Sequence, residues 1–152
     1  MKFVAQFVLV LLFIGCNSSN TSTENNNKTT ESASDSLMHE ILRQHDIGMA
    51  KMNKISDAKN RIQHSLDSIS KLPFDIQKKS VQYRMGLDSA FNWLTFADSH
   101  METWMNEFNM DSLKDDQEKQ IKYFESEKIK ISHVNDEMIS SLRKADSLLR
   151  KK

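Results

Sequence analysis

Three long stretches of the chain repeat apolar residues at alternating steps of three and four, the spacing that places them on one side of a helix. The clearest stretch runs from Tyr83 to Phe108 and contains both tryptophans of the sequence. Its apolar positions are Tyr83, Leu87, Ala90, Leu94, Ala97, Met101, Trp104 and Phe108. We expect this seam to form the centre of the core, with Leu94, Trp104 and Phe108 as its anchors.

The same spacing occurs before and after this stretch. An earlier helix is predicted from Ser36 to about Lys71, because Asp35 and its serine neighbours offer capping oxygens and Pro73 cannot continue a helix. Its stripe reads Ile41, His45, Met49, Met52, Ile55, Lys59, Ile62, Leu66 and Ile69. A later helix follows a polar turn at residues 109–112. Its stripe reads Ile121, Phe124, Lys128, Ile131, Asn135, Met138, Leu142, Ala145 and Leu149.

These patterns predict an all-α fold. With the middle helix placed at about 75–108, the three helices have similar lengths and short connections, so neighbours should run antiparallel. The expected architecture is an up-down-up three-helix bundle with long, coiled-coil-like helices, preceded by a disordered tether. The sequence has only three glycines and one proline, which also favours a few long helices over many short strands.

The start of the chain differs from the rest. Met1 and Lys2 give a positive beginning, residues 3–14 are almost entirely apolar, and Gly15 and Cys16 follow, which is the outline of a secretory signal peptide. The segment LLFIGC resembles the lipobox of bacterial lipoproteins. That resemblance implies that Cys16 is lipidated, becomes the mature N-terminus and anchors the protein to a membrane. The alternative is a cleaved soluble export signal that happens to end in cysteine.

Residues 17–35 are rich in Asn, Ser and Thr and nearly free of apolar side chains, so they are predicted to be a disordered linker. The expected organisation is a signal peptide at 1–15, the lipidated cysteine and linker at 16–35, and the bundle at 36–152. In lipoproteins of the Bacteroidota, a run of acidic residues just after the cysteine resembles the signal for export to the cell surface. Here the first acid is Glu24, so we expect the periplasmic face of the outer membrane.

Charge and motif content narrow the function. The chain has 21 basic and 21 acidic residues, mixed along the helical part, which argues against a nucleic-acid-binding face. A single cysteine allows neither an internal disulfide nor a thiolate metal cluster. The chain lacks a glycine-rich phosphate loop, and no pattern of nucleophile and base stands out. We therefore expect a protein that is not an enzyme and needs no cofactor.

Methionine and histidine suggest one alternative. If the first two helices fold back on each other around Pro73, His45 should face Met101, with Met49 and His100 close to that level. Thioether and imidazole groups are ligands that suit Cu(I). A copper or haem site formed by these four residues is therefore possible, while the simpler interpretation is that methionines fill the core and pack on aromatic rings. Asp98 lies beside the seam and should pair with His45 or with a lysine of the last helix.

Several of these positions resemble a known group of proteins. They are Met38-His39-Glu40, His45-Asp46, Met49, Met52, Ala97-Asp98, Met101, Trp104-Met105 and Phe108. They resemble small Bacteroidota lipoproteins labelled "viral A-type inclusion protein", over the lipobox and most of residues 37–149. That group has no established activity, so the resemblance supports fold and location and transfers no catalytic or binding residue.

The function expected from the sequence is that of a membrane-anchored periplasmic lipoprotein. It would act as a non-catalytic binding or structural helical module in the cell envelope. Its partners would be the membrane, through the N-terminal lipid, and a protein or a second copy of itself, with no nucleic acid. An adaptor that senses envelope stress is a further alternative.

Overall fold

The part of the chain that the structure describes is helical throughout. The computed structural model describes residues 32–150, and within that range it contains four α-helices and no strand. They are α1 (Ala33–Ser70), α2 (Phe74–Lys79), α3 (Val81–Glu107) and α4 (Gln117–Leu149). The prediction of an all-α fold is confirmed. The predicted signal peptide, Cys16 and most of the predicted linker lie outside the described residues.

The first helix begins earlier than the sequence predicts. Ser32 is its N-cap, and the Ser32 hydroxyl oxygen accepts a hydrogen bond of 3.1 Å from the backbone N–H of Asp35. The same hydroxyl donates to the Asp35 carboxylate at 2.7 Å. A capping serine satisfies an N–H that would otherwise lack a partner. Residues 33–35 therefore belong to α1, and the predicted linker of 16–35 extends too far.

The predicted middle helix of 75–108 is divided into two. Helix α2 ends at Lys79, and Ser80 separates it from α3. The Ser80 hydroxyl donates to the backbone carbonyl of Ile76 at 2.9 Å, a local bond of the kind that competes with the helical ladder. The sequence pattern did not reveal this break, because a serine inside an apolar repeat is an ordinary exposed helical residue.

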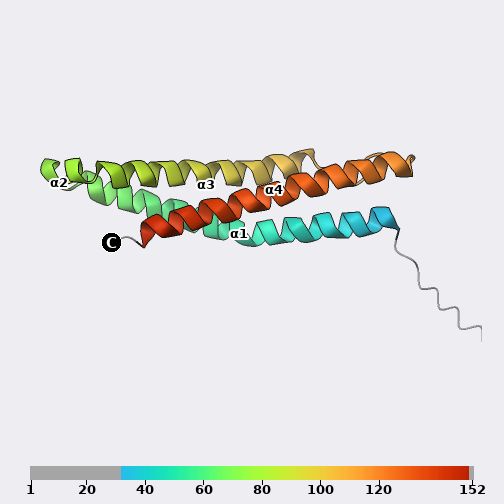
Figure 1. The fold of residues 1–152 in the computed structure, drawn as a ribbon, viewed down its shortest axis with the longest axis horizontal. Coiled ribbons are helices and arrows are strands. Elements are labelled where there is room, and N and C mark those ends of the chain that lie inside the picture. Colours follow the sequence, from blue (N-terminus) through green and yellow to red (C-terminus); the bar gives the residue numbers. More distant parts are fainter. Residues whose placement is uncertain (1–31, 151–152) are drawn as a thin grey trace, which may run out of the picture. The chain divides into compact units, whose positions relative to one another are not determined.

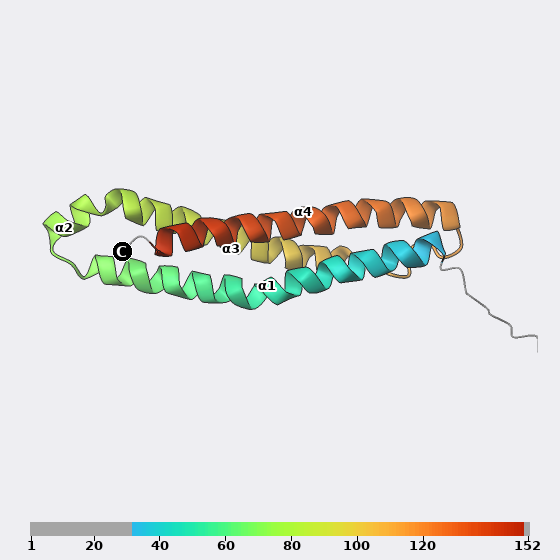
Figure 2. The ribbon, with the colours of Figure 1, turned by 60° about the horizontal axis from the view of Figure 1, so that its bottom comes forward.

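The three long helices lie side by side (Figure 1, Figure 2). Helix α1 contacts both α3 and α4, α3 contacts α4, and the short α2 contacts α3. Polar bonds join each long pair. The Ser34 hydroxyl donates to the side-chain oxygen of Gln120 at 2.7 Å, and Lys59 forms an ion pair of 3.1 Å with Asp98. The indole N–H of Trp104 donates to Glu127 of α4 at 3.0 Å.

The core follows the seam predicted for α3. Its buried residues are Leu87, Ala90, Leu94, Ala97, Met101 and Trp104, while Tyr83 and Phe108 are half-buried. The residues buried from α1 are Ser34, Ile41, Gly48, Ile55, Ala58, Ile62 and Ile69. Those from α4 are Phe124, Glu127, Ile131, Val134, Asn135, Met138, Ser141 and Ala145. Residues 31–152 form one compact unit that contains all of these residues, so the unit has its own hydrophobic core.

Two residues of the predicted stripes are exposed, and the residue before each of them is buried instead. On α1 the buried position is Gly48, and Met49 is exposed. On α4 the buried position is Glu127, and Lys128 is exposed. At Gly48 the rule that apolar side chains point inward selects the neighbouring Met49. At Glu127 the rule gives no preference, because Glu127 and Lys128 are both charged. At Gly48 the space is filled by Met101 of α3, and the buried Glu127 accepts a hydrogen bond from Trp104.

Candidate functional site

The predicted level of methionine and histidine contains a close approach of two helices. The terminal methyl group of Met101 occupies the place where a side chain on Gly48 would begin. The side-chain oxygen of Asn135 would lie 3.0 Å from the same Cβ. Met101 is fully buried. The thioether therefore fills a gap in the core, as methionine commonly does.

The two histidines of the predicted copper or haem site lie in different grooves. His45 lines a groove with Leu42 and the end of α3, and its ring centroid is 6.0 Å from that of Trp104. His100 lines a separate groove between α3 and α4, and its Nδ1 lies 2.5 Å from the Glu137 carboxylate.

The four predicted ligands are therefore not gathered in one place. Met49 is 39% exposed while Met101 is buried, and neither lines the groove of His45 or that of His100. The predicted facing pair of His45 and Met101 is shifted by about one turn, because His45 lies against Trp104. Within residues 32–150 no group of three or more His, Cys, Asp or Glu side chains has an arrangement that could hold a metal ion.

Asp98 has the kind of partner that the sequence predicts, from a different helix. Its carboxylate pairs with Lys59 of α1 at 3.1 Å, and each side chain is 24% exposed. Neither expected partner, a lysine of the last helix or His45, pairs with Asp98. The Nδ1 of His45 instead lies 3.2 Å from the Oδ1 of Asp46. Lys59 is one of the two polar residues in the predicted α1 stripe, so its pairing explains why a cation can stand in that seam.

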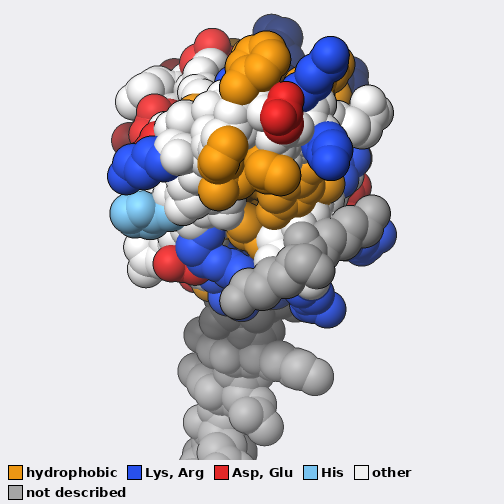
Figure 3. Space-filling model, turned by 90° about the vertical axis from the view of Figure 1, so that its left-hand side faces the viewer, with side chains coloured by type: hydrophobic (Ala, Val, Ile, Leu, Met, Phe, Trp, Pro, Cys, Tyr) orange, Lys and Arg blue, Asp and Glu red, His pale blue; other side chains and the backbone are white. Residues whose placement is uncertain are grey.

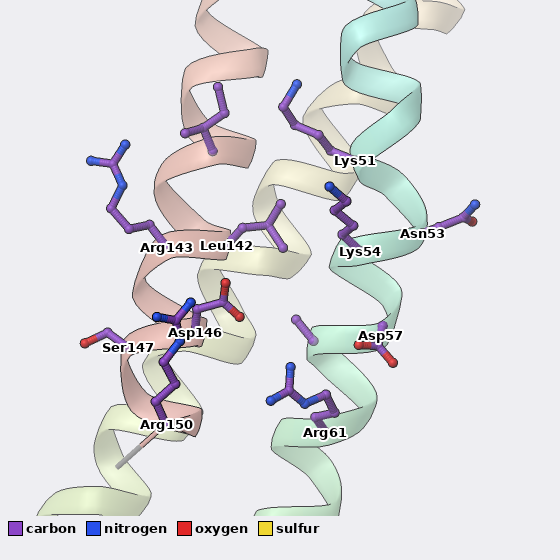
Figure 4. Close-up of a pocket in the computed structure, with 12 residues that line it drawn as sticks. Lys51, Asn53, Lys54, Asp57, Arg61, Leu142, Arg143, Asp146, Ser147 and Arg150 are labelled. Carbon is purple, nitrogen blue, oxygen red and sulfur yellow. The ribbon is translucent and has the colours of Figure 1, made fainter.

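A different cluster of side chains forms a polar site between two of the long helices. A groove of about 930 Å³ runs between α1 and α4 (Figure 4). Its lining combines an apolar floor, five cations, two carboxylates and two small polar residues. These are Ala58, Ile139 and Leu142; Lys51, Lys54, Arg61, Arg143 and Arg150; Asp57 and Asp146; and Asn53 and Ser147.

The cations of this groove are not neutralised within the described chain. The lining carries a net charge of +3, although the whole protein is neutral. None of Lys54, Arg61, Arg143 and Arg150 forms an ion pair with another residue of 32–150. Other surface cations of α4 do, as Lys119 pairs with Asp116 and Lys122 pairs with Glu118. The groove therefore concentrates positive charge that has no partner among the residues described.

The electrostatics of Lys51 agree with that arrangement. Burial lowers the pKa of the Lys51 ammonium group, and the charge of nearby Lys54 lowers it further. The ammonium group donates a hydrogen bond of 2.7 Å to the backbone carbonyl of Ile47. In Figure 4 the side chains of Lys51 and Arg61 extend from α1 toward α4, and Asp146 extends from α4 toward α1. An anion in the groove would relieve the repulsion between the two lysines.

Sequence reasoning missed this groove, and a signal for it exists. Lys51 and Lys54 are one helical turn apart, and Arg61 and Asp57 continue the same side of α1. Arg143 and Arg150 are similarly placed on α4. The sequence shows these two basic faces, but only the packing of α1 against α4 shows that they border one groove.

Comparison with known proteins assigns no function to the chain. No known protein family matches the chain, and no curated protein or solved structure is similar to it. None of the helices within residues 32–150 combines the length and the apolar character needed to span a bilayer. The groove and the pattern of the sequence are therefore the features that bear on function.

Proposed function

We propose that this protein is a lipid-anchored lipoprotein of the bacterial cell envelope whose helical unit is a non-catalytic binding module. Its binding surface is the groove between α1 and α4, and its partner presents an anionic group, such as phosphate or carboxylate, to that groove. The observation that carries the proposal is the gathering of five cations, none of which forms an ion pair within residues 32–150, along one groove with an apolar floor.

The scaffold of the proposal is an up-down-up bundle of α1, α3 and α4. Bonds between the helices support this order. Tyr83, His100 and Trp104 of α3 bond to Leu148, Glu137 and Glu127 of α4, in that order. Residue numbers rise along α3 while those of the partners fall along α4, so the two helices run in opposite directions. Helices α1 and α4 then run in the same direction, and their adjacent basic faces remain together over several turns.

Guanidinium groups suit the proposed partner. Arginine presents several N–H donors in a planar fork that matches carboxylate and phosphate oxygens, and it keeps its charge at any physiological pH. Three of the five cations are arginines: Arg61, Arg143 and Arg150. The two carboxylates, Asp57 and Asp146, would restrict binding to ligands that place their anionic groups between the cations.

The anchoring part of the proposal depends on Cys16 and is tested separately. In cells, Cys16→Ala should make the protein removable from the membrane fraction by a high-salt wash, because the acyl chains supply the anchor that resists salt. Mass spectrometry of the mature N-terminus should show the acyl chains in the natural protein. A mature N-terminus with an unmodified cysteine would contradict the anchor, whatever the groove binds.

The groove is tested with a defined probe. Inorganic tripolyphosphate should bind the fragment of residues 31–152 in calorimetry, and binding should weaken as salt is added. The double variant Arg61→Gln, Arg143→Gln should bind at least about tenfold more weakly, since each charge-assisted bond contributes roughly 1.5–3 kcal/mol. The pKa of Lys51, followed by NMR, should rise when the probe binds.

The matched control removes two cations of α4 that already have ion pairs. Lys119→Gln, Lys122→Gln changes the net charge by the same amount and lies outside the groove. It should bind the probe within about twofold of the natural protein, an effect that reflects long-range charge alone. Equal losses in the two double variants would show non-specific attraction and would overturn the groove as the binding surface.

A further inference from the structure

At the end of the helical unit that carries α2, exposed large apolar residues are more closely spaced along the sequence than in the rest of the described chain. Leu72, Phe74, Ile76, Val81 and Met85 are between 40% and 78% exposed, and Phe74 is the most exposed of them. They account for five of the fourteen exposed large apolar residues and lie within a segment of fourteen residues. Figure 3 views this end and shows apolar side chains grouped near its centre, with others at its upper edge. We call these five residues the α2 patch.

Most of the α2 patch, from Leu72 to Val81, lies beyond the end of α4, and Met85 lies at the level of its last turn. Leu148, in the last turn of α4, packs against Gly86, and its backbone carbonyl accepts a hydrogen bond from Tyr83 at 3.4 Å. Helix α4 ends one residue later. Among the described residues, the chain from about 71 to 82 therefore projects past the third helix, and α2 has no buried residue.

The turn that presents the patch is held by hydrogen bonds. The side-chain amide of Gln77 donates to the backbone carbonyls of Ser70 and Leu72, at 3.0 and 2.8 Å. The backbone N–H of Leu72 donates to Ile69 at 3.1 Å. The apolar side chains are thus displayed by an ordered turn, which would lose little conformational freedom on docking.

The charges around the patch indicate what would cover it. Residues 70–86 contain four cations, Lys71, Lys78, Lys79 and Arg84, and one acid, Asp75, a local charge of +3 in a chain that is neutral overall. Figure 3 shows Lys and Arg side chains around the apolar patch. Exposed apolar residues surrounded by cations are the arrangement with which peripheral proteins enter the interface of an anionic bilayer.

We propose that the α2 patch docks on the surface of an anionic phospholipid membrane. Phe74, Ile76 and Met85 would enter the interfacial region, while Lys71, Lys78 and Lys79 would contact lipid phosphates. This contact is separate from the anchor at Cys16 and from the α1–α4 groove. A lipoprotein with both features would hold its helical unit to a membrane at a second point, on the same bilayer or on a facing one.

The test uses residues 31–152, which contain the whole described core and leave out Cys16. This fragment should sediment with vesicles of phosphatidylglycerol and phosphatidylcholine and not with phosphatidylcholine vesicles alone. Phe74→Ser, Met85→Ser should reduce partitioning by about tenfold or more, because both side chains lose their apolar contact with lipid. Lys78→Gln, Lys79→Gln should reduce it by a similar factor and weaken its dependence on salt.

Two controls match these variants. Trp93→Ser, Phe96→Ser removes apolar residues that are 54% and 58% exposed on α3, outside the patch, and should leave partitioning within about twofold. Arg61→Gln, Arg143→Gln should lose tripolyphosphate binding and keep vesicle binding, so the groove and the patch succeed or fail independently. Circular dichroism of each variant verifies that its helices are intact.

Three results would overturn the proposal. The first is no sedimentation of the natural fragment with anionic vesicles. The second is sedimentation that Phe74→Ser, Met85→Ser leaves unchanged. The third is light scattering that shows a dimer of the natural fragment and a monomer of that variant, which would assign the patch to a second copy of the chain.

Discussion

The two ends of the helical unit use similar residues in opposite ways. At the end that joins α3 to α4, aromatic rings are packed against one another: Trp104 and Phe108 stack with centroids 4.9 Å apart, and Phe108 stacks on Tyr123 at 6.3 Å. We call this the aromatic end. At the α2 end, Phe74 is 78% exposed and makes no ring contact within residues 32–150.

The difference comes from the number of helices that reach each end. At the aromatic end α1, α3, α4 and the connection at 108–116 meet, and the hydroxyl of Tyr123 accepts the backbone N–H of Asn109 at 2.9 Å. At the α2 end, the described part of α4 stops at the level of Tyr83 and Gly86. Five large apolar residues there are at least 40% exposed, which is why we assign them to an external surface.

The largest expected effect comes from exchanging one aromatic residue at each end for alanine. Trp104→Ala should lower the free energy of unfolding by about 3–5 kcal/mol, since it opens a cavity and leaves the buried Glu127 carboxylate without the indole donor. Phe74→Ala should change it by no more than about 0.5 kcal/mol. Urea unfolding followed by circular dichroism measures both, and similar costs at the two ends would contradict the comparison.

The aromatic end also shows what the sequence could predict. The repeat from Tyr83 to Phe108 identified the buried face of α3 correctly, because nearly all of its inward positions are apolar. The apolar repeat of α4 could not identify Glu127 as buried, since an acidic side chain is normally exposed. The one available signal was Trp104 itself, whose N–H needs an acceptor when the ring is buried.

Elsewhere the sequence was insufficient for physical reasons. Gly48 has no side chain, so a hydrophobic pattern selects Met49 in its place, and only the packing shows that Met101 fills the gap. The charges of the α1–α4 groove lie on two helices far apart in sequence, and their proximity depends on the register of packing. The α2 patch arises because α2 and the turn before it extend past α4, a property of relative lengths that periodicity does not contain.

Alanine substitutions at two glycines should change the free energy of unfolding by smaller amounts and in opposite directions. Gly48→Ala should destabilise the fold by about 1–2 kcal/mol despite alanine's better helix propensity, because its Cβ would overlap Met101 and press on Asn135. Gly86→Ala should leave stability unchanged or raise it by up to about 1 kcal/mol. Its Cβ would meet only the end of the Leu148 side chain, at 3.2 Å, near the open α2 end where that side chain can shift.

Thermal unfolding of Gly48→Ala, of Gly86→Ala and of the variant that combines them measures this contrast. The sites are on different helices and contact different residues, so the double variant should show the sum of the two changes. The variant Gly48→Ala, Met101→Ala should be no less stable than Met101→Ala alone, because the overlapping methyl group is gone. Destabilisation by Gly86→Ala equal to that of Gly48→Ala would show that the α2 end is as tightly packed as the core.

The smallest expected effect is a dependence on acid that is confined to the aromatic end. Hydrogen bonds from Arg43, and then from Gln44, lower the pKa of Glu40 from 4.5 to about 2. A side-chain bond from Lys119 lowers the pKa of Asp116, the N-cap of α4. A carboxyl group with a lowered folded-state pKa stabilises the fold above its unfolded value, and this contribution is lost as the pH falls through the folded value.

The contribution of Glu40 should therefore be complete above about pH 4.5 and disappear toward about pH 2. Because the Glu40 and Arg43 side chains are 29% and 57% exposed, solvent screens the pair and the change should be small. Glu40→Gln cannot ionise, so its melting temperature should fall less than that of the natural protein over this range. Amide hydrogen-exchange protection factors, which remove the intrinsic pH dependence of the exchange rate, locate the effect. Acid should lower protection at the start of α1 and of α4 and leave the turn held by Gln77 unaffected, whereas lower protection at that turn would show that the two ends respond together.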